Sequence, residues 1–201
     1  MSANLPKNAC FDVSPEMIAS MVKGSEWDIL LLGDGSGTGD WSMAGGWACA
    51  IIERESDVRS CCWGGWSMCD IIVAELSAYL QALMEIEALR GKSLGRQFGR
   101  PLKILIVTDN SVVATQSQLA LSGGRVGGAT NPIWAGIRQI VTSTGTSLAF
   151  RFAPRRSTML NVLVDQVAGR LRRVVSDSKL GQYRAKDGSG RALKSLNPKS
   201  R

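Results

Sequence analysis

Trp27-Asp-Ile-Leu-Leu-Leu-Gly-Asp-Gly-Ser-Gly-Thr-Gly-Asp40 is the stretch from which the fold of this chain can be read. Its apolar run, Ile29 to Leu32, is too short to cross a membrane and predicts a buried strand that closes on a glycine-rich turn. Asp34 stands at the end of that strand. A buried carboxylate is unfavourable unless something cationic pairs with it, and no Lys or Arg lies between Lys23 and Arg54. The stretch therefore predicts a strand that carries a carboxylate in need of a partner.

Three further acids stand at the edges of apolar segments much later in the chain: Glu75, Asp109 and Asp165. Four carboxylates brought together repel one another, and a divalent cation is the usual remedy. For each acid taken singly, a solvated end of an element is the alternative interpretation. Taken together, the four acids predict a metal site.

Apolar periodicity and turn residues predict the remaining elements. Two strands follow the opening strand with short links, which indicates an antiparallel meander. The predicted order continues with strands over 45–53 and 59–66, a helix that begins after Asp70, a strand over 101–109, helices over 111–121 and from Asn131, a strand over 146–152, and a helix from about 158 to 175.

Length and charge predict one domain with an extension at each end. The chain has 201 residues, enough for one sizeable core. We expect residues 1–26 to form an extension with a short helix, residues 27–175 the domain, and residues 176–201 a flexible basic tail. From residue 170 onward ten Lys or Arg stand against two Asp, so 14 of the 24 basic and 15 of the 17 acidic residues remain before it. A neutral body with a basic tail favours a polyanionic partner, and a solubilising tail is the alternative.

Cysteine and histidine usage narrows the chemistry. Five cysteines, two of them adjacent, fit a reducing compartment, and the N-terminus lacks the apolar segment of a secretory signal. We therefore expect an intracellular, cytoplasmic protein that does not span a membrane. The chain has no histidine, which argues against catalytic triads and against a zinc site built on Cys61, Cys62 and Cys69. Hydrolysis here would depend on a metal and carboxylates.

Five segments, in the right order over about residues 28 to 175, resemble the ribonuclease H family. They are its first-strand acid, its first-helix acid motif, its Thr-Asp-Ser segment, the Asn and Trp that open a later helix, and its final Asn-x-x-x-Asp-x-x-Ala pattern. In this chain they read Asp34-Gly-Ser, Ala74-Glu75-Leu76, Val107-Thr-Asp-Asn-Ser111, Asn131-Pro-Ile-Trp134 and Asn161-Val-Leu-Val-Asp165-Gln-Val-Ala168.

The resemblance implies an α/β fold with a mixed five-stranded sheet in the order 3-2-1-4-5, strand 2 antiparallel to the rest, and helices on both faces. It implies endonucleolytic cleavage of the RNA strand of an RNA–DNA hybrid, and we expect the protein to be a monomer. Two Mg²⁺ ions, with Mn²⁺ as the alternative, would be held by the four acids: Asp34, Glu75, Asp109 and Asp165. Two metals suit phosphodiester cleavage because negative charge develops on the attacking and departing oxygens together.

The resemblance also implies residues that contact the substrate. They are Gly35, Ser36, Asn110, Ser111 and Asn161, although Asn161 could instead cap the last helix. The family commonly has a histidine in the loop before that helix, where this chain has Arg155 and Arg156. Either arginine could assist product release electrostatically, but a guanidinium does not accept a proton at ordinary pH.

Two other functions fit the same residues. One is a nucleic-acid- or partner-binding module that keeps the fold and the basic tail with little or no turnover. The other is a related nuclease of the same superfamily that acts on DNA. Cleavage of a labelled hybrid distinguishes the enzyme from the binding module. A panel of RNA and DNA substrates distinguishes the ribonuclease from the DNA nuclease.

Overall fold

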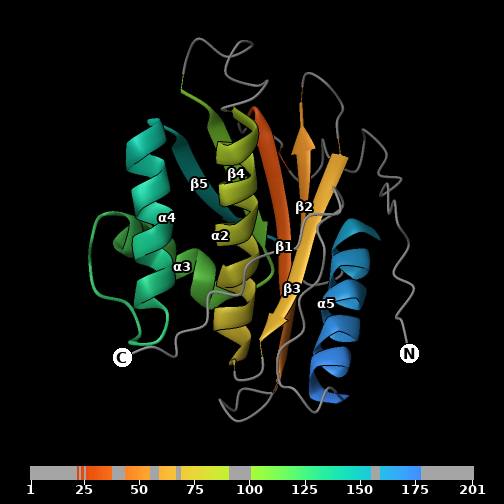
Figure 1. The fold of residues 1–201 in the computed structure, drawn as a ribbon. Helices are drawn as coiled ribbons and strands as arrows, with labels where there is room; N and C mark the ends of the chain where they lie inside the picture. Colours follow the sequence, from red (N-terminus) through yellow and green to blue (C-terminus); the bar gives the residue numbers. More distant parts are fainter. Residues whose placement is uncertain are drawn as a thin grey trace.

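Five strands form one mixed sheet with helices against both of its faces (Figure 1). The structure is a computed structural model that describes residues 22, 24, 26–37, 44–54, 59–66, 69–90, 101–154 and 159–177. Its elements are β1 (Ile29–Ser36), β2 (Gly45–Glu53), β3 (Arg59–Trp66), α2 (Ile71–Arg90), β4 (Lys103–Thr108), α3 (Ser111–Leu121), α4 (Asn131–Thr144), β5 (Ser147–Phe152) and α5 (Met159–Asp177).

The order of the strands is β3-β2-β1-β4-β5. Strand β2 runs antiparallel to β1 and β3, whereas β4 runs parallel to β1 and β5. The predicted order and the antiparallel second strand are therefore confirmed.

Strand β1 contributes to two cores because its side chains alternate between the faces of the sheet. Ile29 and Leu31 are buried with residues of α2 and α4. Leu30 and Leu32 are buried on the other face with residues of α5. The helices α2 and α4 thus cover one face and α5 covers the opposite one (Figure 1).

Side-chain caps and a glycine set the helix ends. The backbone N–H of Val73 donates to Asp70 Oδ1 at 2.8 Å, so Asp70 caps α2 as predicted. Asn110 Oδ1 accepts from two backbone N–H groups in the first turn of α3, at 3.0 and 3.3 Å. Gly145 ends α4 in the left-handed region with φ +66°.

Strand β1 is longer than the sequence predicted. It continues to Ser36, paired with β2, so the prediction that Asp34 stands at a strand end is wrong. The glycines reflect packing rather than a turn at this point: a Cβ on Gly33 would lie 2.5 Å from the ring of Tyr79, and one on Gly35 would lie 2.3 Å from the backbone nitrogen of Glu75. Glycine alternating with other residues in β1 therefore allows the close approach of α2.

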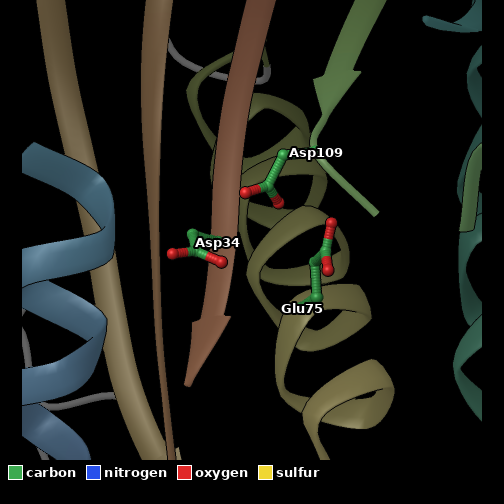
Figure 2. Close-up of side chains that lie close together, drawn as sticks. All are labelled: Asp34, Glu75 and Asp109. Carbon is green, nitrogen blue, oxygen red and sulfur yellow. The ribbon is translucent and has the colours of Figure 1, made fainter. Parts of the chain in front are cut away.

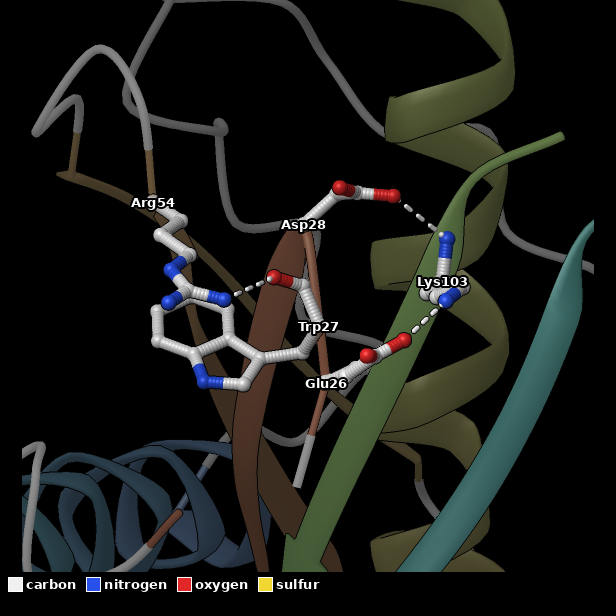
Figure 3. A network of polar contacts seen from close by, with 5 residues as sticks. All are labelled: Glu26, Trp27, Asp28, Arg54 and Lys103. Carbon is white, nitrogen blue, oxygen red and sulfur yellow. Dashed lines mark hydrogen bonds and ion pairs between the residues drawn. The ribbon is translucent and has the colours of Figure 1, made fainter. Parts of the chain in front are cut away.

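Polar contacts tie the start of β1 to its neighbours (Figure 3). The backbone N–H of Lys103 donates to the buried Asp28 Oδ2 at 2.8 Å, and the N–H of Asp28 donates to the carbonyl of Lys103 at 2.7 Å. The Arg54 guanidinium donates to the carbonyl of Trp27 at 3.5 Å and lies over its ring, while Lys103 pairs with Glu26. The contacts of Lys103 join the start of β1 to β4, and those of Arg54 join it to the end of β2.

Several expectations concern residues outside the described ranges. Of the expected N-terminal helix, Val22 is described; it is helical and packs against the core on the α5 side. Residues 178–201 lie outside the described part, so the division of the chain into extension, domain and tail stays a prediction. No described helix combines the length and the hydropathy needed to cross a membrane.

Candidate metal centre

Two parallel strands bring two carboxylates to the same place. Strands β1 and β4 pair in parallel as far as Leu32 and Val107, whose side chains share one core cluster. Two residues further along, Asp34 is still within β1, while β4 has ended and Asp109 follows it. Because paired parallel strands advance together, Asp34 and Asp109 arrive side by side at the point where β4 stops.

Glu75 reaches the same place from helix α2 (Figure 2). It is only 2% exposed, and the two glycines of β1 leave room for the helix that carries it. Ligand oxygens of Asp34, Glu75 and Asp109 all lie within 4.8 Å of one another. The predicted convergence is thus confirmed for three of the four acids, which we call the acid cluster.

Two buried hydroxyl groups orient Glu75. Thr108 Oγ1 donates to Glu75 Oε1. The hydroxyl of Tyr79 lies 3.3 Å from the same oxygen, 3.0 Å from the carbonyl of Gly33 and 3.4 Å from the carbonyl of Val107, so it touches all three elements that carry the cluster. Sequence reasoning missed both roles. The signals were there, since Tyr79 stands one helical turn after Glu75 and Thr108 directly precedes Asp109.

Burial disfavours the ionised form of the cluster. Burial, followed by the charges of Asp109 and Glu75, raises the pKa of Asp34 from 3.8 to about 8. Burial also raises the pKa of Glu75 from 4.5 to about 7, although the hydrogen bond from Thr108 opposes the change. Within the described residues, Asp34 Oδ2 is buried and has no hydrogen-bond partner. Hard divalent cations bind carboxylate oxygens, so the donors fit Mg²⁺ or Mn²⁺.

Asp165 lies beside the cluster rather than in its centre. It is half-buried on α5, on the face of the sheet opposite α2. A side-chain hydrogen bond between Asp34 and Asp165 contributes to the raised pKa of Asp34, after burial and the charges of Asp109 and Glu75. Asp165 is not a member of the group within 4.8 Å. The structure thus places the fourth acid next to Asp34, outside that group.

The other predicted site residues are scattered around this centre. Gly35 and Ser36 end β1, next to Asp34. Asn110 caps α3 and also hydrogen-bonds to Glu75, while Ser111 is exposed at the start of α3. Asn161 lies within α5, whose described residues begin at Met159, and its side chain is outside the described part, so its role as a cap or a substrate contact stays a prediction. Arg155 and Arg156 lie outside the described residues.

The cysteines do not form a metal site in the described part of the chain, where the acid cluster is the one group of suitable ligands found. Cys49, Cys62 and Cys69 are buried free thiols, and the side chain of Cys61 is outside the described part. Burial raises the pKa of Cys69 to about 12, which disfavours the thiolate that zinc requires.

No family model matches this chain, and no curated protein matches it in sequence. Solved structures, in contrast, share its fold. LC11-RNase H1 in complex with an RNA/DNA hybrid is 19% identical with a TM-score of 0.55, over 73% of this chain and 97% of that one. The N-terminal RNase H domain of a Mycobacterium tuberculosis protein is 13% identical with a TM-score of 0.56, over 74% and 96%.

A viral protein shows the same likeness. A structure of the foamy viral protease-reverse transcriptase in complex with double-stranded DNA is 20% identical with a TM-score of 0.51, over 74% of this chain and 96% of that one. At these identities the likeness concerns the fold, and the observed strand order agrees with it. This chain therefore has a ribonuclease H-like fold.

Proposed function

We propose that this protein is a metal-dependent endonuclease that cleaves the RNA strand of RNA–DNA hybrids. The observation that carries the proposal is the meeting of Asp34, Glu75 and Asp109 at the end of β4, with a buried oxygen of Asp34 left without a hydrogen-bond partner in the described structure. The hybrid is the proposed substrate because a solved structure of this fold, LC11-RNase H1, is a complex with one.

The three acids of the cluster would hold the metal, with Asp165 completing the set from the opposite side of β1. Two bound Mg²⁺ ions would supply an activated water and stabilisation of the leaving 3′-oxygen. The chain's own contribution is to fix the ligands: Thr108 and Tyr79 orient Glu75, and α5 presents Asp165 to Asp34. Ligands fixed in this way need no rearrangement at each turnover.

The test is cleavage of a hybrid labelled on its RNA strand, in Mg²⁺, by the full chain and by Asp109→Asn. We expect the RNA to be cut internally. The substitution should reduce the rate by at least about 100-fold, because it removes a ligand of the metal that would stabilise the negative charge of the transition state. Asp28→Asn is the matched control, since Asp28 is also a buried acid but lies at the far end of β1. It should leave the rate unchanged within about twofold.

The same assay separates the alternatives. Cutting that survives Asp109→Asn would remove the acid cluster from the reaction. Cutting of DNA but not of the hybrid would favour a DNA nuclease, an alternative supported by the neighbouring fold that was solved with double-stranded DNA. Binding of the hybrid without cutting in either Mg²⁺ or Mn²⁺ would leave a binding module.

A further inference from the structure

One flank of α5 runs from the acid cluster along the ends of β1 and β2. Asp165 and Arg172 are seven residues apart, which places them on the same side of the helix and about 10 Å apart along its axis. Between them, a Cβ on Gly169 would lie 3.9 Å from Ser36 Oγ at the end of β1. A Cβ on Gly46 of β2 would lie 2.4 Å from the backbone nitrogen of Arg172. Arg172 therefore stands where α5 crosses β2, beyond Asp165.

The positive charge of Arg172 has no partner in the part of the molecule that the structure describes. Its Nε is buried, and neither a hydrogen bond nor an ion pair to a described residue satisfies the guanidinium. A guanidinium stays protonated at all ordinary pH, so the group cannot relieve the mismatch by losing a proton. Buried donors are nearly always paired, and an orphaned one points to an absent acceptor.

The surroundings of Arg172 attract anions. Arg170 and Arg173 are exposed on the outer side of the same helix. No Asp or Glu stands between Asp165 and Asp177 in the sequence. Three arginines therefore stand within four positions of α5, without a carboxylate between them, and add positive charge within two helical turns of the acid cluster.

We propose that Arg172 binds a backbone phosphate of the same nucleic-acid strand whose scissile phosphodiester lies at the acid cluster. The planar fork of a guanidinium matches the oxygens of a phosphate. Phosphates of one strand rise about 3.4 Å per nucleotide, so the spacing from Asp165 corresponds to about two or three nucleotides. A nucleic-acid strand is favoured over a small anion because one strand can reach both the acid cluster and Arg172. The identity of the ligand as a nucleic acid rests on the proposed function, whereas the contact itself rests on the position of Arg172 in α5.

The test is binding of a fluorescent RNA–DNA hybrid in Mg²⁺, measured by anisotropy over a range of NaCl concentrations. All proteins carry Asp109→Asn so that the probe stays intact. We expect Arg172→Gln to weaken binding about five- to tenfold and to reduce the slope of log K against log salt by about one, as the loss of one phosphate contact requires. Arg54→Gln, which removes the same charge at the far end of the sheet, should change neither quantity.

Arg172→Lys keeps the charge and loses the fork, so it should retain the salt slope and bind with intermediate affinity. Equal affinities and slopes for Arg172→Gln and Arg54→Gln would overturn the proposal. Displacement of the hybrid by poly-glutamate as readily as by unlabelled hybrid would also overturn it, in favour of an acidic protein partner.

A measurement on intact Arg172 covers the case in which Arg172→Gln does not fold. The Nε–H resonance of Arg172 is identified by its loss in Arg172→Lys, and it should shift when hybrid is added. An unshifted resonance at saturating hybrid contradicts the contact. Cleavage by the wild-type protein is measured separately. A salt slope that changes in Arg172→Gln, without cleavage by the wild type, refutes the proposed function alone. Cleavage by the wild type, with an unchanged salt slope in Arg172→Gln, refutes the role of Arg172 alone.

Discussion

Asp34 opposes the folding of the metal-free chain over part of the pH range. Its pKa is about 8 in the folded state against 3.8 for an unperturbed aspartate, so the folded protein holds a proton that the unfolded chain has released. The stability that this proton provides is fully present below about pH 4 and is lost as the pH rises towards 8. Glu75, with a pKa raised to about 7, acts in the same direction.

We therefore expect the Tm of the metal-free protein to fall between about pH 5 and about pH 8.5, and Mg²⁺ to raise it by several degrees more at the higher pH. Asp34→Asn removes a buried charge, so in EDTA at about pH 8.5 it should raise Tm, and it should abolish most of the effect of Mg²⁺. Circular dichroism during heating measures both. Asp28→Asn should keep the wild-type response to Mg²⁺; a metal-free Tm that rises with pH contradicts the account.

Tyr79 should influence metal binding through Glu75. Tyr79→Phe keeps the ring, which packs edge-on against Phe150 at 6.1 Å between centroids, and removes the hydroxyl that contacts Glu75. We expect a loss of about 1 kcal/mol in the free energy of unfolding. We also expect an approximately tenfold lower affinity for Mg²⁺, measured from the Mg²⁺ concentration needed to raise Tm.

The matched control for Tyr79→Phe is Thr115→Val. It removes an exposed hydroxyl on α3 that donates to a backbone carbonyl at 2.8 Å, away from the cluster. A Mg²⁺ titration followed by thermal unfolding compares the two variants. If both show the wild-type Mg²⁺ dependence, Tyr79 is a packing residue only.

Among the elements, the contact of α2 with β1 decides whether the cluster forms. Gly35 lies against the backbone of Glu75, so the helix and the strand meet without an intervening side chain. The face of α2 that follows carries Leu76, Tyr79 and Leu83 into the core, each at most 1% exposed. The same contact therefore buries apolar surface and places a carboxylate.

Gly35→Ala should separate the two elements. Its Cβ would lie 2.3 Å from the Glu75 nitrogen, which the backbone cannot accommodate without moving. We expect a loss of about 2 kcal/mol or more in the free energy of unfolding, measured by urea denaturation, together with a weaker response to Mg²⁺.

Gly128→Ala provides the comparison, because nothing lies within 4 Å of the added Cβ and its φ is not positive. It should change stability by less than about 1 kcal/mol. Equal losses in the two variants would mean that the approach of α2 to β1 is not the cause.

For the whole molecule, we expect the basic C-terminal residues to contribute to nucleic-acid affinity and not to the stability of the fold. Residues 178–201 carry seven Lys or Arg and one Asp, and the core and acid cluster that the structure describes are built by residues before them. Ending the chain after Asp177 should leave Tm within about 2 °C of wild type. It should weaken hybrid binding at low salt at least about tenfold and reduce the salt slope. Anisotropy and thermal unfolding of the same samples measure both.

Replacing those seven basic residues by Gln in the full-length chain serves as the control for length. It should weaken binding as much as the truncation does if charge is the cause. A truncated protein with the wild-type salt slope would show that residues 178–201 do not contact the nucleic acid.

The sequence by itself determined the order and type of the elements and the identity of the acids. Apolar periodicity, the Asp70 cap and the Asn131-Pro132 pair are local signals, and local signals set where a helix or strand begins. The strand order followed from the resemblance, because five motifs in one order specify a topology that periodicity alone leaves open.

Only the tertiary structure decided how far β1 extends, that Gly35 serves the approach of α2, and that Tyr79 and Thr108 orient Glu75. It also decided that three acids meet within 4.8 Å while Asp165 stands to one side, and that the Nε of Arg172 is buried. The reason is physical: these properties depend on distances between residues far apart in the chain, which are set by the packing of helices against the sheet and not by any local pattern.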